Sequence, residues 1–272
     1  MENPSNSICE LKHEFVKSYD GNSHTTEVLP KNFSSKIPIN NEHLKSLHEF
    51  LKNNPIYSNQ ISKMMLETEC TIFEGDLNNY WIDSIKHDAS YAPFYPTWML
   101  SALSLAIEAQ KLGYEQIIDI GSGDGRIAYC GKILGLNSIS IEIDENLVGL
   151  QENISKKTGI LFNPMCFDAT IFDFDEIPNK KSIFVIGGVP EIGEVLAESV
   201  IKNALESSHF ENPSFILTGS HSHRKFSRDP THFGWGTTIK KFELSVISAI
   251  SLPTYWTMDQ EFETPYVFTK KE

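Results

Sequence analysis

The sequence predicts an α/β protein in which a doubly wound, mostly parallel sheet is covered by helices on both faces. Strand-like and helix-like segments alternate from residue 116 to residue 220, and a glycine-rich turn directly follows the first of these strands. Strands that alternate with helices favour parallel pairing, since each helix carries the chain back to the start of the next strand. With 272 residues, 40% of them hydrophobic, the chain can bury one large domain with an appendage.

Hydrophobic periodicity predicts where each element lies. The predicted strands cover residues 116–120, 138–143, 160–166, 182–188 and 214–220, and the predicted helices cover residues 126–134, 145–158 and 193–207. An earlier helix begins after Pro96 and Thr97, runs to about Lys111 and ends at Gly113. Two strand-like runs close the chain with no clear helix between them, at residues 241–250 and 265–271. They predict an antiparallel C-terminal hairpin at the edge of a Rossmann-like sheet.

The first part of the chain has a different character. Residues 1–40 are polar and rich in Ser and Asn, which predicts an arm that docks loosely or is partly disordered. Residues 41–95 predict a helical and aromatic cap: one helix follows Asn40, and a second helix carries Ile61, Met64 and Met65. Residues 96–272 form the predicted α/β domain.

Charge and composition exclude several classes of protein. The formal net charge of −13 would repel a phosphate backbone, so extensive nucleic-acid binding is not expected. The longest apolar stretch, at residues 98–109, is shorter than the roughly 20 residues of a membrane span. The opening residues are polar, unlike a secretory signal, so we expect a cytoplasmic protein without a membrane partner. Nothing in the sequence predicts the oligomeric state.

The glycine-rich turn, at residues 117–131, could hold a dinucleotide, a nucleoside triphosphate or an adenosyl sulfonium. A triphosphate loop needs a lysine directly after its glycines, and none occurs before Lys132. A dinucleotide turn needs a third glycine where Arg126 stands. The observed pattern is an acidic residue followed by three alternating glycines, namely Asp119, Gly121, Gly123 and Gly125.

This pattern resembles the class I S-adenosylmethionine-dependent methyltransferases. The resemblance covers the order of elements from about residue 90 to residue 272 and is specific over residues 117–144. Within the class, the segments YAPFYPTW, DIGSGDGR and IEID look most like the protein-lysine methyltransferases related to the ATP synthase c-subunit enzyme. The resemblance implies an enzyme that uses S-adenosyl-L-methionine as cofactor and methylates a protein lysine, with residues 96–272 as the cofactor-binding domain.

The turn residues fit such a cofactor. Gly121, Ser122, Gly123 and Gly125 would form its cradle, because glycines allow left-handed backbone and leave no side chain in the way. The cofactor's carboxylate could meet free N–H groups at the start of the following helix. Asp119, at the end of its strand, could pair with the cofactor's ammonium group.

Two further acidic positions follow the next strands. Glu142 could accept hydrogen bonds from both ribose hydroxyls, with Ile143 beside the cofactor. In the resembling family, an acidic residue followed by a small one contacts the adenine amino group, and Asp168 with Ala169 match that pattern. Asp173 and Asp175 are competing candidates for the adenine contact.

The resemblance brings the loop at residues 187–194 to the donor methyl group. Gly187 would line the cofactor there, and Glu191 could orient a basic acceptor or simply carry the N-terminal charge of the next helix. Tyr91 stands where the resembling lysine methyltransferases carry a tyrosine near the cofactor. Glu191 and Tyr91 are therefore the candidate catalytic residues.

Aromatic and histidine residues leave alternatives open. An acceptor channel could be lined by the residues that precede the sheet, or these could pack the cap: Tyr80, Trp81, Tyr91, Phe94 and Tyr95. His221, His223 and His232 lack further ligands at convincing spacing, so no metal is predicted. The alternatives to a protein-lysine methyltransferase are a small-molecule N- or O-methyltransferase and a non-catalytic cofactor-binding scaffold; an NAD-dependent reductase is disfavoured by Arg126.

Overall fold

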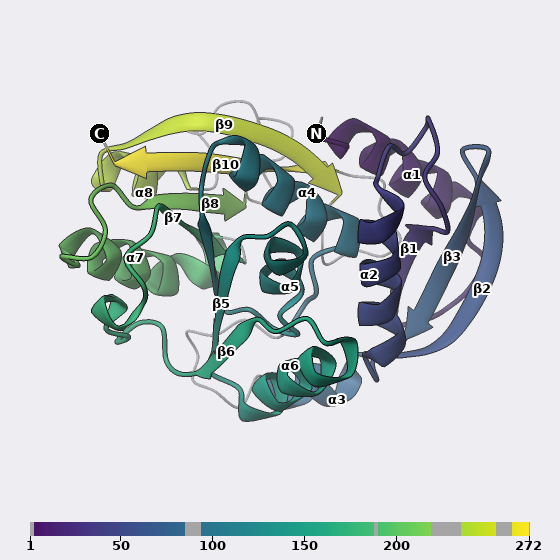
Figure 1. Cartoon of the computed structure of the whole chain (residues 1–272), viewed down its shortest axis with the longest axis horizontal. Coiled ribbons are helices and arrows are strands. Elements are labelled where there is room, and N and C mark those ends of the chain that lie inside the picture. The colour runs from purple at the N-terminus through teal and green to yellow at the C-terminus, as the bar shows by residue number, and fades with distance from the viewer. Residues whose placement is uncertain (1–2, 85–93, 188–189, 219–234, 254–262, 272) are drawn as a thin grey trace.

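A seven-stranded sheet forms the centre of the computed structural model, which describes residues 3–84, 94–187, 190–218, 235–253 and 263–271 (Figure 1). The strand order is β6-β5-β4-β7-β8-β10-β9. The first five of these strands are parallel, and β10 runs antiparallel to both β8 and β9. The strands are β4 (Gln116–Ile120), β5 (Asn137–Glu142), β6 (Asn163–Cys166), β7 (Ser182–Ile186), β8 (Ser214–Thr218), β9 (Leu244–Pro253) and β10 (Glu263–Lys271). The predicted Rossmann-like sheet with an antiparallel C-terminal hairpin is confirmed.

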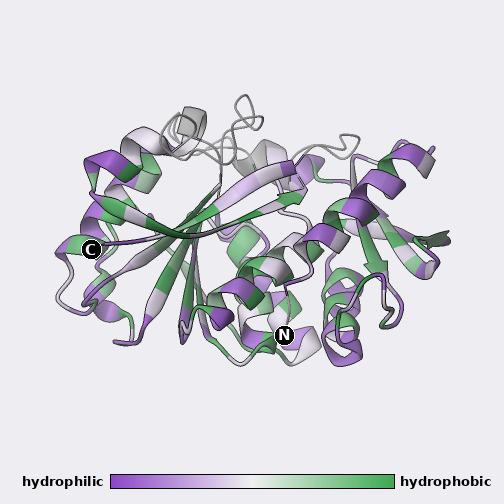
Figure 2. Cartoon of the chain, turned by 90° about the horizontal axis from the view of Figure 1, so that it is seen from above, coloured by the Kyte–Doolittle hydropathy of each residue, from purple (hydrophilic) through white to green (hydrophobic). Residues whose placement is uncertain are grey.

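Helices cover both faces of this sheet. One core contains residues of α4 (Met99–Lys111), α5 (Arg126–Ile133) and α6 (Glu145–Thr158). The other contains residues of η1 (Phe174–Glu176), α7 (Pro190–Glu206) and α8 (Gly236–Lys241). Alternation along β4 sends Ile117 into the first core and Ile118 into the second. Hydrophobic residues gather along the strands and inner helix faces, and hydrophilic residues lie outside (Figure 2).

Capping residues explain where the central helices begin and end. The Asp144 side chain accepts the N–H of Asn146 at 2.8 Å and starts α6, and Gly159 ends that helix with a φ of 72°. Strand β6 begins three residues later than predicted, because the carbonyl of Ile160 accepts the Ser155 hydroxyl at 2.9 Å instead of joining the sheet. In the described part of the chain, no helix combines the length and the apolar composition needed to cross a membrane.

The N-terminal region contains a second sheet, which the sequence did not predict. Its three antiparallel strands have the order β1-β3-β2 (Figure 1). The elements are α1 (Ser5–Ser18), β1 (Thr25–Pro30), α2 (Asn41–Asn53), β2 (Tyr57–Met65), β3 (Thr68–Gly75) and α3 (Asn78–Ser84). The cap at residues 41–95 is thus only partly helical, and the predicted helix through Ile61, Met64 and Met65 is wrong. All three residues lie on β2, an edge strand of the small sheet. The side chains of Ile61 and Met64 are exposed there, and their spacing in the sequence resembles that of a helix with one apolar face.

The expectation of a loosely docked or disordered arm at residues 1–40 is also wrong. Every residue of β1 is buried, and β1 packs against α4. Helix α1 packs against β9 and α4, and its few apolar residues share one buried face. Phe15 stacks on Tyr19 with ring centroids 4.8 Å apart and lies 6.3 Å from the Trp98 ring. A mostly polar segment can still be anchored when its apolar residues point one way.

Replacing Phe15 tests whether α1 is an integral part of the fold. Phe15→Ala should lower the free energy of unfolding by about 3 to 5 kcal/mol, because it empties a fully buried aromatic site. Phe33→Ala, at a side chain that is 57% exposed, is the control and should change stability by less than about 0.5 kcal/mol. Urea unfolding measures the stability of both variants. If Phe15→Ala were as stable as Phe33→Ala, the N-terminal segment would be only loosely docked after all.

Candidate functional site

The glycine turn lies at the carboxyl edge of the sheet, between β4 and α5. Gly121, Gly123 and Gly125 have φ values of 62°, 57° and 78°, which L-amino acids with side chains rarely adopt. The Gly125 N–H donates to the Ser122 carbonyl at 2.9 Å, and Gly125 directly precedes α5. Ligands of open α/β sheets bind at this edge.

Two of these glycines are also required by close packing. A methyl group at Gly123 would overlap the ring of Phe94, which is buried against the turn. A methyl group at Gly125 would lie 2.7 Å from the ring of Phe162. Gln151 on α6 donates to the Gly123 carbonyl at 2.7 Å and ties the turn to that helix. The turn is therefore fixed by side chains on both sides.

Asp119 ends up buried beside the turn, on the same face of the sheet as α5. Its Oδ2 accepts the N–H of Ala128, in the first turn of α5, at 3.3 Å. Among the described residues, no lysine, arginine or histidine forms an ion pair with Asp119. Burial raises the pKa of the Asp119 carboxyl well above its usual range, and the charges of Glu142 and Asp124 raise it further. A carboxylate in this position is short of positive charge.

Glu142 lies at the carboxyl end of β5, and its carboxylate points to the turn. Oε2 accepts the Gly123 N–H at 2.8 Å, while Oε1 accepts the N–H groups of Ile143 at 2.9 Å and Asp144 at 3.1 Å. Burial raises the pKa of Glu142, and these backbone donors oppose the rise. Three of roughly four acceptor positions are used. Glu142 and the turn are thus in direct contact, which the sequence analysis did not predict.

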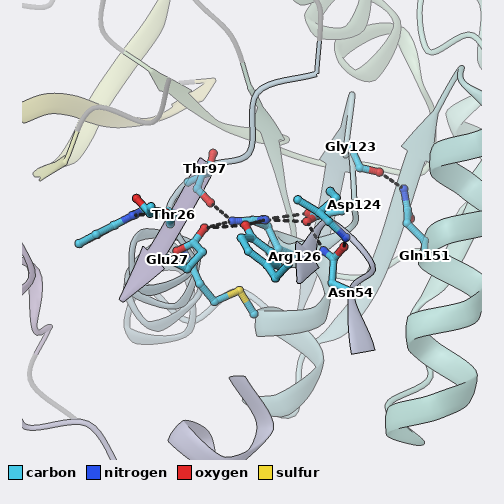
Figure 3. Close-up of polar contacts among 12 residues, drawn as sticks. Thr26, Glu27, Asn54, Thr97, Gly123, Asp124, Arg126 and Gln151 are labelled. Atoms are coloured by element: carbon cyan, nitrogen blue, oxygen red, sulfur yellow. Dashed lines mark hydrogen bonds and ion pairs between the residues drawn. The ribbon is translucent and has the colours of Figure 1, made fainter. Parts of the chain in front are cut away.

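Arg126 occupies the centre of a buried polar network beneath the turn (Figure 3). Its guanidinium forms a fork with Asp124, through Nε to Oδ1 at 2.8 Å and Nη2 to Oδ2 at 2.6 Å. Nη1 donates to Glu27 on β1 and to the Thr97 carbonyl at 2.5 Å, and Nη2 donates to the Tyr57 hydroxyl at 3.1 Å. Burial opposes the charge of Arg126, but Asp124, Tyr57 and Glu27 together raise its pKa above the usual value. Arg126 therefore stays charged.

Sequence reasoning missed this network and used Arg126 only as a residue that does not fit a dinucleotide turn. Glu27, Asn54 and Tyr57 come from segments far away in the chain, so no spacing pattern marks them. The available signal was the arginine itself, because a guanidinium expected within a buried turn needs carboxylate partners. Asn54 completes the group by donating to Asp124 Oδ2 at 2.9 Å.

The acidic residues after β6 separate into different roles. Asp168 follows β6 at the carboxyl edge, where its Oδ1 accepts the N–H and the hydroxyl of Thr170 at 2.9 and 2.7 Å. The neighbouring Ala169 is buried. Asp173 caps η1, and Asp175 accepts hydrogen bonds from Ser207 and Ser208 after α7, near the start of β8. Asp175 therefore lies toward the opposite edge of the sheet from Asp168.

Other predicted site residues are only partly described. Gly187 follows β7 at the carboxyl edge, and among the described residues no atom lies within 4 Å of a methyl group built on it. Glu191 lies in the first turn of α7, but its side chain is outside the described part, and Tyr91 lies outside the described residues altogether. The aromatic candidates divide: Phe94 packs on the turn, Tyr80 and Trp81 pack against the larger core, and Tyr95 is exposed.

Two other features lie outside the candidate site. The described residues hold no cluster of three or more potential metal ligands, while His221, His223 and His232 fall outside them. A groove of about 770 Å³ separates α2 from the small sheet, and none of the predicted site residues lines it. Of its three lysines, Lys31 pairs with Glu69 and Lys52 pairs with Glu49.

The chain matches no protein-family model and no curated protein sequence. It is similar in structure to the tRNA (uracil-54, C5)-methyltransferase of Pyrococcus abyssi, in complex with S-adenosyl-L-homocysteine, with a TM-score of 0.46 and 13% identity over 66% of this chain. It is also similar to TrmN of Thermus thermophilus, with a TM-score of 0.42 and 12% identity over 75% of this chain. A third similar structure is magnesium protoporphyrin IX methyltransferase of Synechocystis, with a TM-score of 0.44 and 9% identity over 71% of this chain. The alignments span 40%, 57% and 96% of these chains, respectively.

A substitution at Gly123 tests the packing of the turn. Gly123→Ala should lower stability by about 1 to 3 kcal/mol more than Gly159→Ala, because Gly159 shares the positive φ but has open space around it. Adding Phe94→Ala should reduce the extra loss, since it removes the overlapping ring. Thermal unfolding of the three single variants and the double variant completes the cycle, and an unchanged loss in the Phe94→Ala background would rule out this contact.

Proposed function

We propose that this protein is an S-adenosyl-L-methionine-dependent methyltransferase whose cofactor binds at the turn between β4 and α5. The observation that carries the proposal is a left-handed glycine turn flanked by two buried carboxylates, Asp119 and Glu142, at the carboxyl edge of a parallel sheet. The seven-stranded mixed sheet with its antiparallel hairpin is a Rossmann-like methyltransferase fold and supports the same proposal. The order of motifs in the sequence agrees with both.

The charge around the turn favours a cationic ligand. Glu27, Asp119, Asp124 and Glu142 are buried together with a single arginine, Arg126. This excess of carboxylates would repel the phosphates of a dinucleotide or a triphosphate. The cofactor S-adenosyl-L-methionine carries a sulfonium and an ammonium group, so it would supply the missing positive charge. Asp119 would pair with the ammonium group. Arg126 cannot take that place beside Asp119, because all its N–H donors are engaged with other acceptors.

The remaining residues suit the rest of the cofactor. A ribose diol needs two acceptor positions on Glu142, so at least one of its three backbone contacts must be exchanged when the cofactor binds. Asp168 and Ala169 would receive the adenine amino group. Since Asp119 already holds the Ala128 N–H, the start of α5 offers the cofactor's carboxylate fewer free donors than the sequence suggested.

The chemistry is the transfer of a methyl group from an already activated donor. When bound, S-adenosyl-L-methionine supplies a methyl carbon that leaves sulfur as it bonds to the acceptor nitrogen, and the sulfonium becomes a neutral thioether. The protein then contributes position and a neutral acceptor. A lysine acceptor, with an ordinary pKa near 10.4, must lose a proton, which a desolvated channel would promote. Tyr91 and Glu191 are the proposed residues for orienting it.

We propose a protein lysine as the acceptor. The segment YAPFYPTW resembles that of protein-lysine methyltransferases, and the net charge of −13 would attract a basic protein rather than a nucleic acid. A small-molecule acceptor or a non-catalytic scaffold is the alternative.

Titration with S-adenosyl-L-homocysteine tests the cofactor site through Asp119. The pKa of Asp119 is raised in the unliganded folded state, and a bound ammonium group should lower it. Affinity should therefore increase as the pH rises through the raised pKa, with release of a proton on binding. Asp119→Asn should weaken binding at neutral pH by about 10- to 100-fold and flatten this pH dependence. Calorimetry in buffers of different ionisation enthalpy measures both effects.

Stability provides the matching control. A raised folded-state pKa stabilises the unliganded protein below the unfolded value of about 3.9, and that contribution is lost as the pH rises through the raised value. Unliganded Asp119→Asn should thus be at least as stable as the natural protein at neutral pH while binding the ligand poorly. Binding of NADH in place of S-adenosyl-L-homocysteine would contradict the proposed function.

Transfer of a labelled methyl group identifies the acceptor class. With labelled S-adenosyl-L-methionine and a cell extract separated by size, label should enter protein and appear as methyl-lysine after hydrolysis. Asp119→Asn is the control for transfer that depends on the site. Label confined to small metabolites would refute the lysine acceptor, and the absence of transfer by a protein that binds the cofactor would favour a scaffold.

A further inference from the structure

We propose that the N-terminal sheet is required for the geometry of the cofactor site, because Glu27 on β1 positions the glycine turn through Arg126. The inference rests on the proposed function, since it makes Glu27 and Arg126 positioning residues for the turn that would receive the cofactor. Glu27 lies in the segment that the sequence presents as a polar arm, 99 residues before Arg126. The two side chains meet in the interior, with 1% and 2% of their surface exposed.

The contact is specific because the guanidinium has no spare donor. Arginine carries five N–H groups in a fixed fork, and here all five have acceptors: Asp124 twice, Glu27, the Thr97 carbonyl and the Tyr57 hydroxyl. The acceptors come from β1, from the start of β2, from the segment before α4 and from the turn itself (Figure 3). The guanidinium therefore has one position, defined jointly by the small sheet and the α/β domain.

Arg126 transmits this position directly to the turn. Its other partner, Asp124, stands between Gly123 and Gly125 and is fully buried. The bidentate contact fixes the Asp124 carboxylate, and Asn54 holds the same carboxylate from the end of α2 at 2.9 Å. Any displacement of the guanidinium must therefore move the residue that separates the two glycines.

Glu27 also binds the first residue of α4, the helix that follows Phe94 in the chain. Its Oε2 accepts the N–H of Met99, the first residue of α4, at 2.8 Å. Phe94, five residues earlier, packs on Gly123. Glu27 is therefore connected to the turn in two ways, through Arg126 and through the start of α4.

Glu27→Gln probes this role with little change in shape. The carboxylate accepts a hydrogen bond at each oxygen, from Arg126 and from Met99. An amide offers only one acceptor, so its NH₂ group must face a donor at one of the two contacts. The substitution also leaves Arg126 with one carboxylate in place of two. Both changes should loosen the guanidinium without creating a cavity.

Val28→Ala is the matched control. Val28 is the next residue on the same strand, is fully buried and pairs with Ile72 of β3. Because side chains alternate along a strand, Val28 points away from Arg126. The control variant destabilises the small sheet but leaves the network intact. Both variants are compared at the same interval below their own unfolding midpoints.

Two measurements on the full chain test the inference. Hydrogen exchange of a peptide covering residues 119–131 should be faster by about 10-fold in Glu27→Gln than in Val28→Ala, in the unliganded protein. The dissociation constant for S-adenosyl-L-homocysteine should rise by about 10-fold in Glu27→Gln and by less than about 2-fold in Val28→Ala. These differences separate positioning of the turn from general loss of stability.

The possible outcomes are distinct. Equal exchange of the turn in the two variants would overturn the inference, because Glu27 would then act only as a structural residue. Faster exchange in Glu27→Gln with an unchanged dissociation constant would also overturn it, since the turn would not need this restraint to bind. If the natural protein bound no S-adenosyl-L-homocysteine, the proposed function would fail, while exchange at the turn would still decide whether Glu27 holds it.

Discussion

The buried Arg126 guanidinium is the interaction on which the arrangement of this molecule depends, because it joins the N-terminal sheet to the glycine turn at the start of α5. A buried cation is tolerated only when it is paired and fully hydrogen-bonded, and Arg126 obtains its five acceptors only when the N-terminal sheet, the segment before α4 and the glycine turn are all in place. The contacts of Arg126 with Glu27 and Asp124 define how the N-terminal sheet lies against the turn. Because burying charges offsets much of the energy gained by pairing them, we expect these ion pairs to contribute specificity more than net stability.

The same region combines this satisfied cation with carboxylates that lack one. Asp119 is buried, raised in pKa and without an ion-pair partner among the described residues, whereas Asp124 is fully engaged with Arg126 and Asn54. Such a difference within one turn is expected when a protein keeps a site ready for a ligand. Asp124 is paired in the unliganded fold, whereas Asp119 is buried at a cost in stability. Under the proposed function, stability and ligand binding would depend on different carboxylates five residues apart.

The sequence could predict what depends on local pattern. The alternating elements from residue 116 onward, the cap at Asp144 and the positive φ of the turn glycines all follow from short-range periodicity and from the properties of single residues. The N-terminal hairpin could not be predicted in this way. Its turn consists of Leu66 and Glu67, with φ values of 46° and 59°, where most hairpins have Asn or Gly.

The contact between Glu27 and Arg126 is beyond local pattern for a different reason. It joins residues 99 positions apart, one on β1 and the other at the start of α5, so only the tertiary fold defines it. A glutamate in a polar segment is expected to be a solvent-exposed charge. Neither its sequence neighbours nor its spacing indicates that it has a buried partner. The arginine in the glycine turn was the usable signal: once the turn is expected to be buried, its guanidinium requires carboxylates, although not which ones.

Electrostatics distinguishes the possible ligands of the turn more sharply than glycine spacing does. Spacing excludes a dinucleotide through one position, Arg126, and a single substitution could accommodate that difference. The charge balance is harder to reverse, since Asp119, Asp124 and Glu142 are all buried at the carboxyl edge and, within the described part of the chain, Arg126 is the one buried cation beside them. An anionic ligand would have to enter against these carboxylates, whereas an ammonium or sulfonium group would relieve their repulsion. Under the proposed function, a turn built in this way would select for the charge of its ligand before it selects for shape.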